Sequence, residues 1–298
     1  MTNHAEALAG KLCQGPDPHP RGATRFTVPP GAVDTHAHVI GTEPAYPLVA
    51  GRSYTAPEAT PAAYLAMLDA MGMANGVLVQ VSVHGTDNRL MVETLKASNG
   101  RLKGIGVVEP DVSDAQLEAL AAAGVTGLRI NVLFGGGVGF KAIEPLARRI
   151  APLGWHLQFL IDGQGLIEIG PRLESLPVPF VIDHMGYADA AEGVAQPGFQ
   201  ALLNVLRNAD GWVKLSGAYR LSKQEPSYPD TIPLARALIE ARPERCVWGS
   251  DWPHVAHEGR MPNVGELLDL LADWAPDEAT RRRILVDNPR RLYGFGTP

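Results

Sequence analysis

The chain has 298 residues, of which 26 are basic and 32 are acidic, so its formal charge is −6 at pH 7. This balance, and the lack of any basic run, argue against nucleic acid or an anionic membrane as its partner. Its two cysteines, Cys13 and Cys246, make neither a disulfide framework nor a CxxC metal motif. No apolar stretch approaches the ~18 residues of a membrane span and the start lacks the pattern of a secretory signal, so we expect a cytoplasmic protein.

Prolines set the first 30 residues apart from the rest of the chain. Proline favours extended or turn backbone and donates no backbone hydrogen bond, so we predict an irregular arm over residues 1–30. No sharp change of composition follows, and we expect a single domain over residues 31–298. The prolines of the arm are Pro16, Pro18, Pro20, Pro29 and Pro30.

Short apolar runs recur along this domain at intervals of about 30 residues, which is the size of a strand–helix unit. They are rich in Val, Ile and Leu, as is typical of strands buried on both faces of a parallel sheet. The runs begin near Val33, Gly76, Gly104, Gly127, Trp155, Val178, Trp212 and Arg245.

Helix signals separate the apolar runs. Thr60 and Pro61 have the pattern of an N-cap followed by proline at the first helical position, and Gly72 ends the same segment. Ser113 and Gln116 form a capping-box pattern before the next helix. Apolar residues spaced by three and four predict further helices within residues 141–154, 197–211, 231–243, 264–276 and 277–294.

Eight strands that alternate with helices predict an α/β fold, the (β/α)8 TIM barrel. The alternative is a doubly wound open sheet. That fold usually carries a glycine-rich phosphate-binding turn after its first strand, whereas this chain has the sequence HAHVIG there.

Polar residues gather where the predicted strands end. In a TIM barrel these ends meet at one rim, where the active site of the fold lies. Burying so many ionisable groups for stability alone would be costly, so we prefer an active site to scattered loop residues. The rim residues are Asp34, His36, His38, Gln80, Ser82, His84, Glu109, Arg129, Asn131, Gln158, Asp162, Asp183, His184, Lys214, Ser216, Tyr219, Arg220, Asp251 and His254.

His36 and His38 form an HxH pair on the first strand. Residues two apart on a strand face the same way, so both imidazoles can bind one metal or one polar ligand. Alone, such a pair is also compatible with ordinary hydrogen-bonded core histidines. Together with His184 after the sixth strand and Asp251 in the SDWPH segment after the eighth, it indicates a catalytic site.

Three motifs in this order, VDTHAHVIG, VIDHMG and WGSDWPH, resemble those of the amidohydrolase superfamily. The closing DNPRRLYGF resembles the terminal helix of its amidohydrolase-2 branch, so the resemblance covers about residues 31–296. Within that branch, HMG and SGAYRLS most resemble the lactonases related to 2-pyrone-4,6-dicarboxylate lactonase. The resemblance implies a hydrolase that opens the ring of a cyclic ester.

Many members of the superfamily bind one or two divalent metals, and this sequence departs from their ligand pattern. Arg129 and Asn131 end the fourth strand, so the chain offers no bridging ligand there. Gln158 lies at the end of the fifth strand, and His156 is too early in that strand to reach the rim.

One zinc held by His36, His38, His184 and Asp251 remains the alternative. Arg129 beside it would repel a dication. The pyrone-dicarboxylate lactonases are understood to work without metal and share the arginine at this position. We therefore expect no metal and no other cofactor.

In a metal-free site, Asp251 is the expected general base that takes a proton from water. His36, His38 and His184 are expected to donate hydrogen bonds to the lactone carbonyl and to stabilise the oxyanion that forms there. Each of these roles is a hypothesis that the resemblance suggests.

The expected partner is a small carboxylated lactone, whose carboxylate Arg129 and Arg220 would hold through bidentate pairs. Tyr187 follows HMG directly, where the pyrone-dicarboxylate lactonases carry an arginine, so we expect a different second substituent on the ring. The other substrate-binding candidates are Tyr219, His84, Asn131 and Gln158. For Tyr219 and His84, a purely structural hydrogen-bonding role is the alternative.

The glycine-rich segment at residues 134–140 follows the fourth strand. It lacks the GK[ST] ending of a phosphate-binding loop, so we do not expect it to bind a nucleotide. It is either a flexible connection or a mobile flap whose backbone approaches the substrate.

Two other functions fit the same motifs. One is a zinc-dependent hydrolase or a non-oxidative decarboxylase of the same superfamily, and the other is a non-catalytic barrel that binds a carboxylate. The presence of His36, His38, His184 and Asp251 together argues against the non-catalytic barrel. No oligomeric state follows from the sequence.

Overall fold

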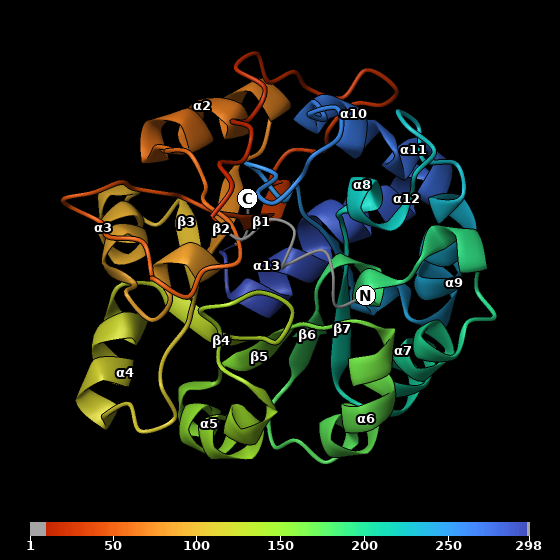
Figure 1. Ribbon diagram of the computed structural model, residues 1–298. Helices are drawn as coiled ribbons and strands as arrows, with labels where there is room; N and C mark the ends of the chain where they lie inside the picture. Colours follow the sequence, from red (N-terminus) through yellow and green to blue (C-terminus); the bar gives the residue numbers. More distant parts are fainter. Residues whose placement is uncertain (1–9, 297–298) are drawn as a thin grey trace.

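The computed structural model describes residues 10–296, which contain one eight-stranded parallel sheet with the strands in chain order (Figure 1). All eight predicted strands are confirmed. Their bounds are β1 (Val33–Ala37), β2 (Asn75–Val79), β3 (Leu102–Gly106), β4 (Val125–Asn131), β5 (His156–Leu160), β6 (Phe180–Ile182), β7 (Gly211–Leu215) and β8 (Cys246–Trp248).

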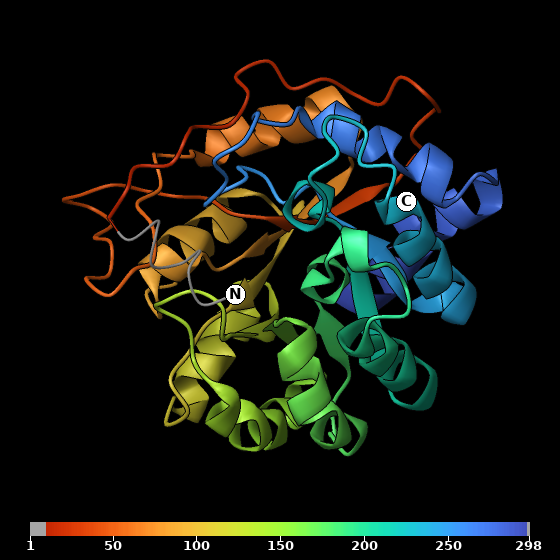
Figure 2. The ribbon, with the colours of Figure 1, turned by 45° about the vertical axis from the view of Figure 1, so that its right-hand side comes forward.

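Contacts between the first and the last strand close the sheet into a barrel. The hydroxyl of Thr35 in β1 donates to the carbonyl of Trp248 in β8 at 2.8 Å. Just beyond β8, Trp252 forms a parallel bridge with Ala37. The fold is therefore the predicted (β/α)8 barrel, with its helices outside the ring of strands (Figures 1 and 2).

The helical elements between and after the strands include α-helices, 3-10 turns and one π-helical turn. The α-helices are α2 (Pro61–Met71), α3 (Arg89–Ala97), α4 (Asp114–Ala122), α5 (Ile143–Ile150), α6 (Gly163–Glu174), α7 (Pro197–Asn208), α8 (Ala218–Leu221), α9 (Thr231–Ala241), α10 (Val264–Asp269), α11 (Leu271–Trp274), α12 (Glu278–Arg282) and α13 (Asn288–Tyr293). The short turns are η1 (Ser82–His84), η2 (Phe140–Ala142), η3 (Ala151–Leu153), η4 (His184–Tyr187), η5 (Ala190–Glu192), η6 (Pro243–Arg245) and the π-helical η7 (Arg283–Asp287).

The predicted helix caps are present. The Thr60 side chain accepts from the backbone of α2, and Gly72 ends that helix at φ 73°. Ser113 and Gln116 form the full capping box of α4. Asp162, predicted at the rim, instead caps α6 by accepting from a backbone N–H, and neither α6 nor α3 was among the predicted helices.

The barrel interior is filled in layers. Its floor is apolar and consists of Val33, Val77, Val79 and Ile105 packed against Tyr293 of α13. Above this floor lie polar side chains of the inner strand faces, and the predicted histidines lie above those. Inward-pointing residues from successive strands make such layers in this fold.

The pairing of β1 with β2 shifts in register between Asp34 and Ala37. Asp34 was predicted at the rim because it is two residues before His36, so on a regular strand both side chains would face the same way. Its carboxylate instead accepts hydrogen bonds from the hydroxyl of Ser250 at 2.8 Å and from Tyr64 of α2 at 3.3 Å. The prediction for Asp34 is therefore wrong, because an irregular strand does not keep the two-residue alternation.

The described part of the predicted arm, residues 10–30, contains no helix or longer strand. Its contacts with the helices after β8 include an ion pair between Arg25 and Asp273 and a 2.8 Å hydrogen bond from Thr24 to Asp269. Residues 1–9 of the arm lie outside the described residues. Between residues 10 and 296, none of the helices has the length and apolar character needed to cross a membrane.

We predict that His156, at the start of β5, makes the protein more sensitive to acid. The ring packs on Tyr293 at 5.4 Å, and burial, with the nearby charge of Lys214, lowers the pKa of His156 to about 3. The unfolded chain binds this proton near pH 6.5, so stability falls as the pH drops from 6.5 towards 3, by about 1.4 kcal/mol per pH unit for this group.

Urea unfolding of the wild type and His156→Leu at pH 7 and pH 4.5 measures this effect. The variant is expected to lose about 2–3 kcal/mol less stability between the two pH values than the wild type. The exposed His19→Leu serves as the control. An equal loss in His156→Leu and the wild type would contradict the prediction.

Candidate active site

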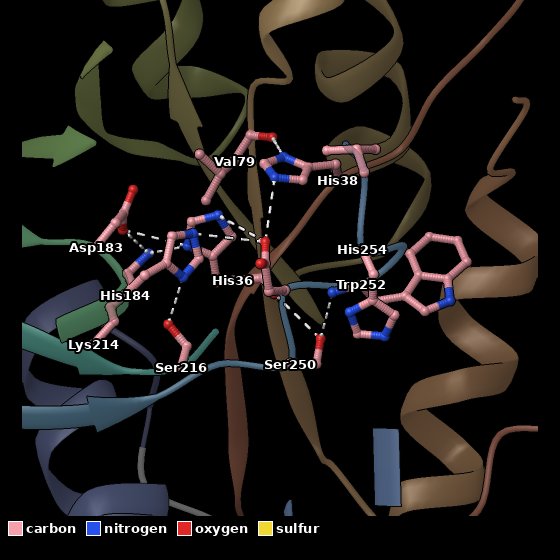
Figure 3. A network of polar contacts seen from close by, with 12 residues as sticks. His36, His38, Val79, Asp183, His184, Lys214, Ser216, Ser250, Trp252 and His254 are labelled. Carbon is pink, nitrogen blue, oxygen red and sulfur yellow. Dashed lines mark hydrogen bonds and ion pairs between the residues drawn. The ribbon is translucent and has the colours of Figure 1, made fainter. Parts of the chain in front are cut away.

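Three imidazoles meet at the carboxyl ends of the strands, and Figure 3 shows them around a common centre. The ring of His36 lies 5.0 Å from that of His38 and 4.6 Å from that of His184, measured between ring centroids. All three side chains are buried. The structure therefore brings together residues from β1 and from the segment after β6, as the sequence predicted.

Asp251, which follows β8, completes this centre. Its backbone lies at φ 61°, a left-handed value uncommon for residues other than glycine, and its N–H donates to the carbonyl of His36 at 2.8 Å. Such backbone strain persists only where the surroundings enforce it, and it is often found at functional sites.

The two oxygens of the Asp251 carboxylate have different surroundings. Oδ2 accepts hydrogen bonds from the Tyr219 hydroxyl and from Nε of Arg220, each at 2.6 Å. Oδ1 lies 3.8 Å from Nε2 of His36 and of His38, and 3.7 Å from Nε2 of His184. One oxygen is thus anchored, and the other faces three imidazoles without touching them.

The other ring nitrogen of each histidine has a partner in the barrel wall. Nδ1 of His38 donates to the carbonyl of Val79 at 2.7 Å, and Nδ1 of His184 lies 2.8 Å from the Ser216 hydroxyl. Because a carbonyl can only accept, the single proton of a neutral His38 is on Nδ1. Its Nε2 is then an acceptor, which differs from the donor role predicted for His38.

The imidazoles are neutral and the carboxylate is ionised near neutral pH. Burial lowers the pKa of His38 to about 3 and that of His184 to about 4. Burial and the charge of Lys214 bring the pKa of His36 well below its usual range. Burial acts to raise the pKa of Asp251, but the charge of Arg220 outweighs it and holds the pKa well below its usual range.

A group of buried charges lies beneath the histidines. Asp183 accepts from Arg129 at 3.2 Å and from the Gln158 amide at 3.1 Å, and it lies 3.5 Å from the ammonium of Lys214. Burial lowers the pKa of Lys214 to about 8, so its charge persists at pH 7. Asp183 therefore balances two cations that come from β4 and β7.

A cavity of about 20 Å³ opens above this centre, which is room for about one water molecule. This volume is far below that of a ligand pocket, so the lining side chains must move to admit a small ring. Arg129 has a buried Nε–H group without a hydrogen-bond partner, so it retains a donor for an anion. Besides His38, His184 and Asp251, the cavity is lined by Tyr54, Ser82, Arg129, Phe134, Leu160, Tyr187, Arg220 and Val255.

The glycine-rich segment after β4 packs closely against the rest of the rim. A Cβ on Gly136, at φ 95°, would lie 2.2 Å from the carbonyl oxygen of Ser82, and one on Gly135 would lie 2.3 Å from that of Gly51. Glycine is required here for close backbone approach. Phe134 at the start of this segment forms part of the cavity wall.

Four residues predicted to bind substrate do not line the cavity. Gln158 lies deeper, where it bonds to Asp183 and Lys214, and Tyr219 donates to Asp251 instead of facing the cavity. Asn131 accepts from the backbone N–H groups of residues 133 and 134 and so shapes the loop after β4. His84 packs beside Tyr46, with ring centroids 6.4 Å apart.

Sequence reasoning missed Tyr54, because it searched for polar residues at strand ends, and it named Phe134 only as part of the glycine-rich segment. Tyr54 lies in the long connection between β1 and α2, and its hydroxyl is 2.9 Å from that of Ser82. No motif marked it. Lys214 and Asp183 were predicted at the rim but without a role, and Glu109 is exposed after β3.

The donor atoms of the centre fit one divalent cation. One atom each from His36, His184 and Asp251 lies within 4.8 Å of the others, and Nε2 of His36 is buried without a partner. The neighbouring charges disfavour a cation, because Arg220 is ion-paired with Asp251 and Arg129 lines the same cavity.

The chain is similar in sequence to known lactone hydrolases. A model of the Amidohydrolase family matches residues 33–295. A 4-sulfomuconolactone hydrolase of Hydrogenophaga intermedia is 39% identical over 99% of this chain and 98% of its own length. A 2-pyrone-4,6-dicarboxylate hydrolase of Comamonas testosteroni is 38% identical over 90% of this chain and 92% of its own.

A solved structure has the same fold over the whole barrel. It is a probable 2-pyrone-4,6-dicarboxylic acid hydrolase of Acinetobacter baumannii with citric acid bound. Its TM-score is 0.80 at 29% sequence identity, and the match covers 89% of this chain and 100% of that chain.

We predict that Asp183→Ala strongly destabilises the protein. The substitution leaves Arg129 and Lys214 buried without their shared counter-ion, which typically costs about 3–5 kcal/mol. Urea unfolding at pH 7 measures the loss. Asp114→Ala, which breaks an exposed ion pair with Arg149, serves as the control and should cost less than about 1 kcal/mol. Equal losses for both variants would refute the prediction.

Proposed function

We propose that this chain, which belongs to the amidohydrolase family, is a hydrolase that opens the ring of a small carboxylated lactone. The observation that carries the proposal is the carboxylate of Asp251. One of its oxygens is anchored by Arg220 and Tyr219, and the other faces three neutral imidazoles at the base of a small cavity. The names of the relatives supply the class of bond that is broken.

The first step is activation of water by Asp251 and His38. Oδ1 of Asp251 and Nε2 of His38 are both acceptors, and they face each other at 3.8 Å. A water molecule between them would donate one hydrogen bond to each, which satisfies both. The ionised carboxylate then takes a proton from this water while the water oxygen attacks the lactone carbonyl.

Asp251 is a weak base, since its pKa lies well below its usual range, so the carbonyl must be strongly polarised. His184 and His36 supply this polarisation through their Nε2–H groups, which stabilise the oxyanion of the tetrahedral intermediate. For His184, the Ser216 hydroxyl then donates to Nδ1.

Breakdown of the intermediate completes the reaction. The bond between the carbonyl carbon and the ring oxygen breaks, and the ring oxygen takes back the proton held by Asp251. One water is added in total. The new carboxylic acid ionises at neutral pH and releases one proton to the solvent.

Two arginines adapt the cavity to an anionic substrate. Arg129 and Arg220 both line the cavity, and each is paired with one buried carboxylate, Asp183 and Asp251 respectively. The unpartnered Nε–H of Arg129 is a donor for a carboxylate. Citric acid, bound by the structurally similar protein of Acinetobacter baumannii, is a polycarboxylate.

We propose further that the reaction needs no metal, because the ion pair with Arg220 and the nearby Arg129 supply positive charge where a cation would otherwise lie. The alternative is one zinc held by His36, His38, His184 and Asp251. When bound, zinc would act as a Lewis acid and lower the pKa of a bound water. Anchoring of Asp251 and recognition of the carboxylate would remain tasks of the same residues.

A pH-indicator assay over carboxylated lactones tests the proposed function. We expect proton release from at least one lactone, with a product heavier by one water. Asp251→Asn should lower kcat by about 10³-fold, because the base is lost, while ligand binding remains. The control is Asp111→Asn, an exposed aspartate beyond β3. An active Asp251→Asn, or a product of unchanged mass, would overturn the assignment.

Metal analysis of the purified protein tests metal independence separately. We expect less than 0.1 zinc per chain by elemental analysis, as an order-of-magnitude limit, and kcat unchanged after incubation with a chelator. About one zinc per chain, together with loss of activity on chelation and recovery on adding zinc, would establish the alternative site instead.

A further inference from the structure

The buried lysine of β7 has no role in the steps above. Lys214 has no exposed surface, and its ammonium lies beside Nδ1 of His36 (Figure 3). A lysine is almost never fully buried unless it is paired, because removing its charge from water is costly. Its position therefore calls for a specific account of each of its hydrogen bonds.

The ammonium of Lys214 has three N–H groups and no lone pair, so it can only donate. It donates hydrogen bonds to three acceptors, and Oδ1 of Asp183 lies 3.5 Å away as an ion-pair partner. The carbonyl of Thr35 and the amide oxygen of Gln158 are each 2.8 Å from Nζ, and Nδ1 of His36 is 3.3 Å away. If all three donors are used, Nδ1 of His36 accepts a hydrogen bond and carries no proton.

Asp183 is the competing partner of the same ring nitrogen. Its Oδ1 also lies 3.3 Å from Nδ1 of His36, but the contact lacks hydrogen-bond geometry, and this oxygen has no hydrogen-bond partner. Its Oδ2 is already used by Arg129 and Gln158. The geometry therefore favours a hydrogen bond from Lys214 to Nδ1 of His36 over one from Nδ1 of His36 to Asp183.

We propose that Lys214 is a positioning residue that holds neutral His36 in the tautomer with its proton on Nε2. The proposal rests on the proposed function and deepens it, because it explains why His36 can donate to the reacting carbonyl. Lys214 itself does not touch the substrate, since it lies beside Nδ1 of His36, whereas the donor to the carbonyl is Nε2.

This assignment divides the work between the two histidines of the HxH pair. The Val79 carbonyl holds the proton of His38 on Nδ1, so Nε2 of His38 accepts. Lys214 holds the proton of His36 on Nε2, so this nitrogen donates. Two imidazoles, one on β1 and one directly after it, both lie 3.8 Å from Oδ1 of Asp251. They thereby act in opposite senses, one towards water and the other towards the carbonyl.

The proposal differs from a purely structural role, in which Lys214 only balances the charge of Asp183. In that case the proton of His36 would be on Nδ1 and would point to Asp183. Nitrogen-15 NMR of histidine side chains distinguishes the two tautomers, because the protonated and unprotonated ring nitrogens have different chemical shifts and couplings.

We therefore suggest long-range ¹H–¹⁵N correlation spectra of the protein labelled in its histidines, at pH 7 without substrate. The signals of His36 are assigned by their loss in His36→Gln. The expected wild-type pattern is the Nε2–H tautomer for His36 and the Nδ1–H tautomer for His38. An Nδ1–H pattern for His36 would overturn the proposal, and this spectrum requires no folded Lys214 variant.

Lys214→Met provides the second arm. Without the lysine donor, Nδ1 of His36 faces only Asp183, so the variant should switch to the Nδ1–H tautomer and lose about 10²-fold in kcat, with KM changed less than about threefold. Lys96→Met, at an exposed lysine of α3, is the matched control and should change neither. An unchanged tautomer in a folded Lys214→Met would contradict the proposal.

Failure of this inference is distinguishable from failure of the proposed function. The tautomer of His36 is read without substrate. If the wild type opens no carboxylated lactone, the proposed function fails whatever the spectrum shows. If it does open one while His36 carries its proton on Nδ1, the role of Lys214 and the donor role of His36 are refuted, while lactone hydrolysis itself stands.

Discussion

The asymmetric environment of one carboxylate determines the organisation of this barrel. Asp251 is buried, and its Oδ2 is held by a guanidinium and a phenol, while its Oδ1 is left to the imidazoles. A buried carboxylate without partners would be neutralised or would destabilise the fold. The ion pair with Arg220 keeps it ionised, and the strained backbone that presents it is held by the hydrogen bond to β1.

The same constraint extends down the barrel axis. Asp183 compensates the charges of Arg129 and Lys214. Gln158 links Lys214 to Asp183, because it accepts a hydrogen bond from the lysine and donates one to the carboxylate. Hydrogen bonds between these buried groups define the orientation of their neighbours. Here the neighbours include His36, so in the proposed mechanism charge compensation and catalysis depend on the same contacts.

Much of this arrangement follows from sequence alone. The spacing of apolar runs predicted the strands, because a parallel sheet buries apolar residues on both faces. Capping residues predicted several helices, because helix ends need specific side chains. The convergence of His36, His184 and Asp251 followed from the rule that strand ends meet at one rim. The position of Asp34 did not follow from the sequence, because the alternation of residues along a strand does not reveal a register shift such as the one in β1.

The finer chemistry was also beyond the sequence. Tyr219 was expected to face the substrate, and the structure turns it towards Asp251, since α8 directs its hydroxyl inward. The acceptor role of His38 depends on the carbonyl of Val79, and backbone groups carry no sequence signal. Tyr54 reaches the cavity from a long connection, where no periodicity predicts the direction of a side chain.

A crystal structure of Asp251→Asn with a bound carboxylated lactone tests the central claim most directly. The account predicts that the lactone carbonyl carbon lies next to the side chain at position 251, with its oxygen towards His36 and His184 and its carboxylate on Arg129 or Arg220. A lactone bound with its carbonyl turned away from these imidazoles, or outside the cavity, would contradict it.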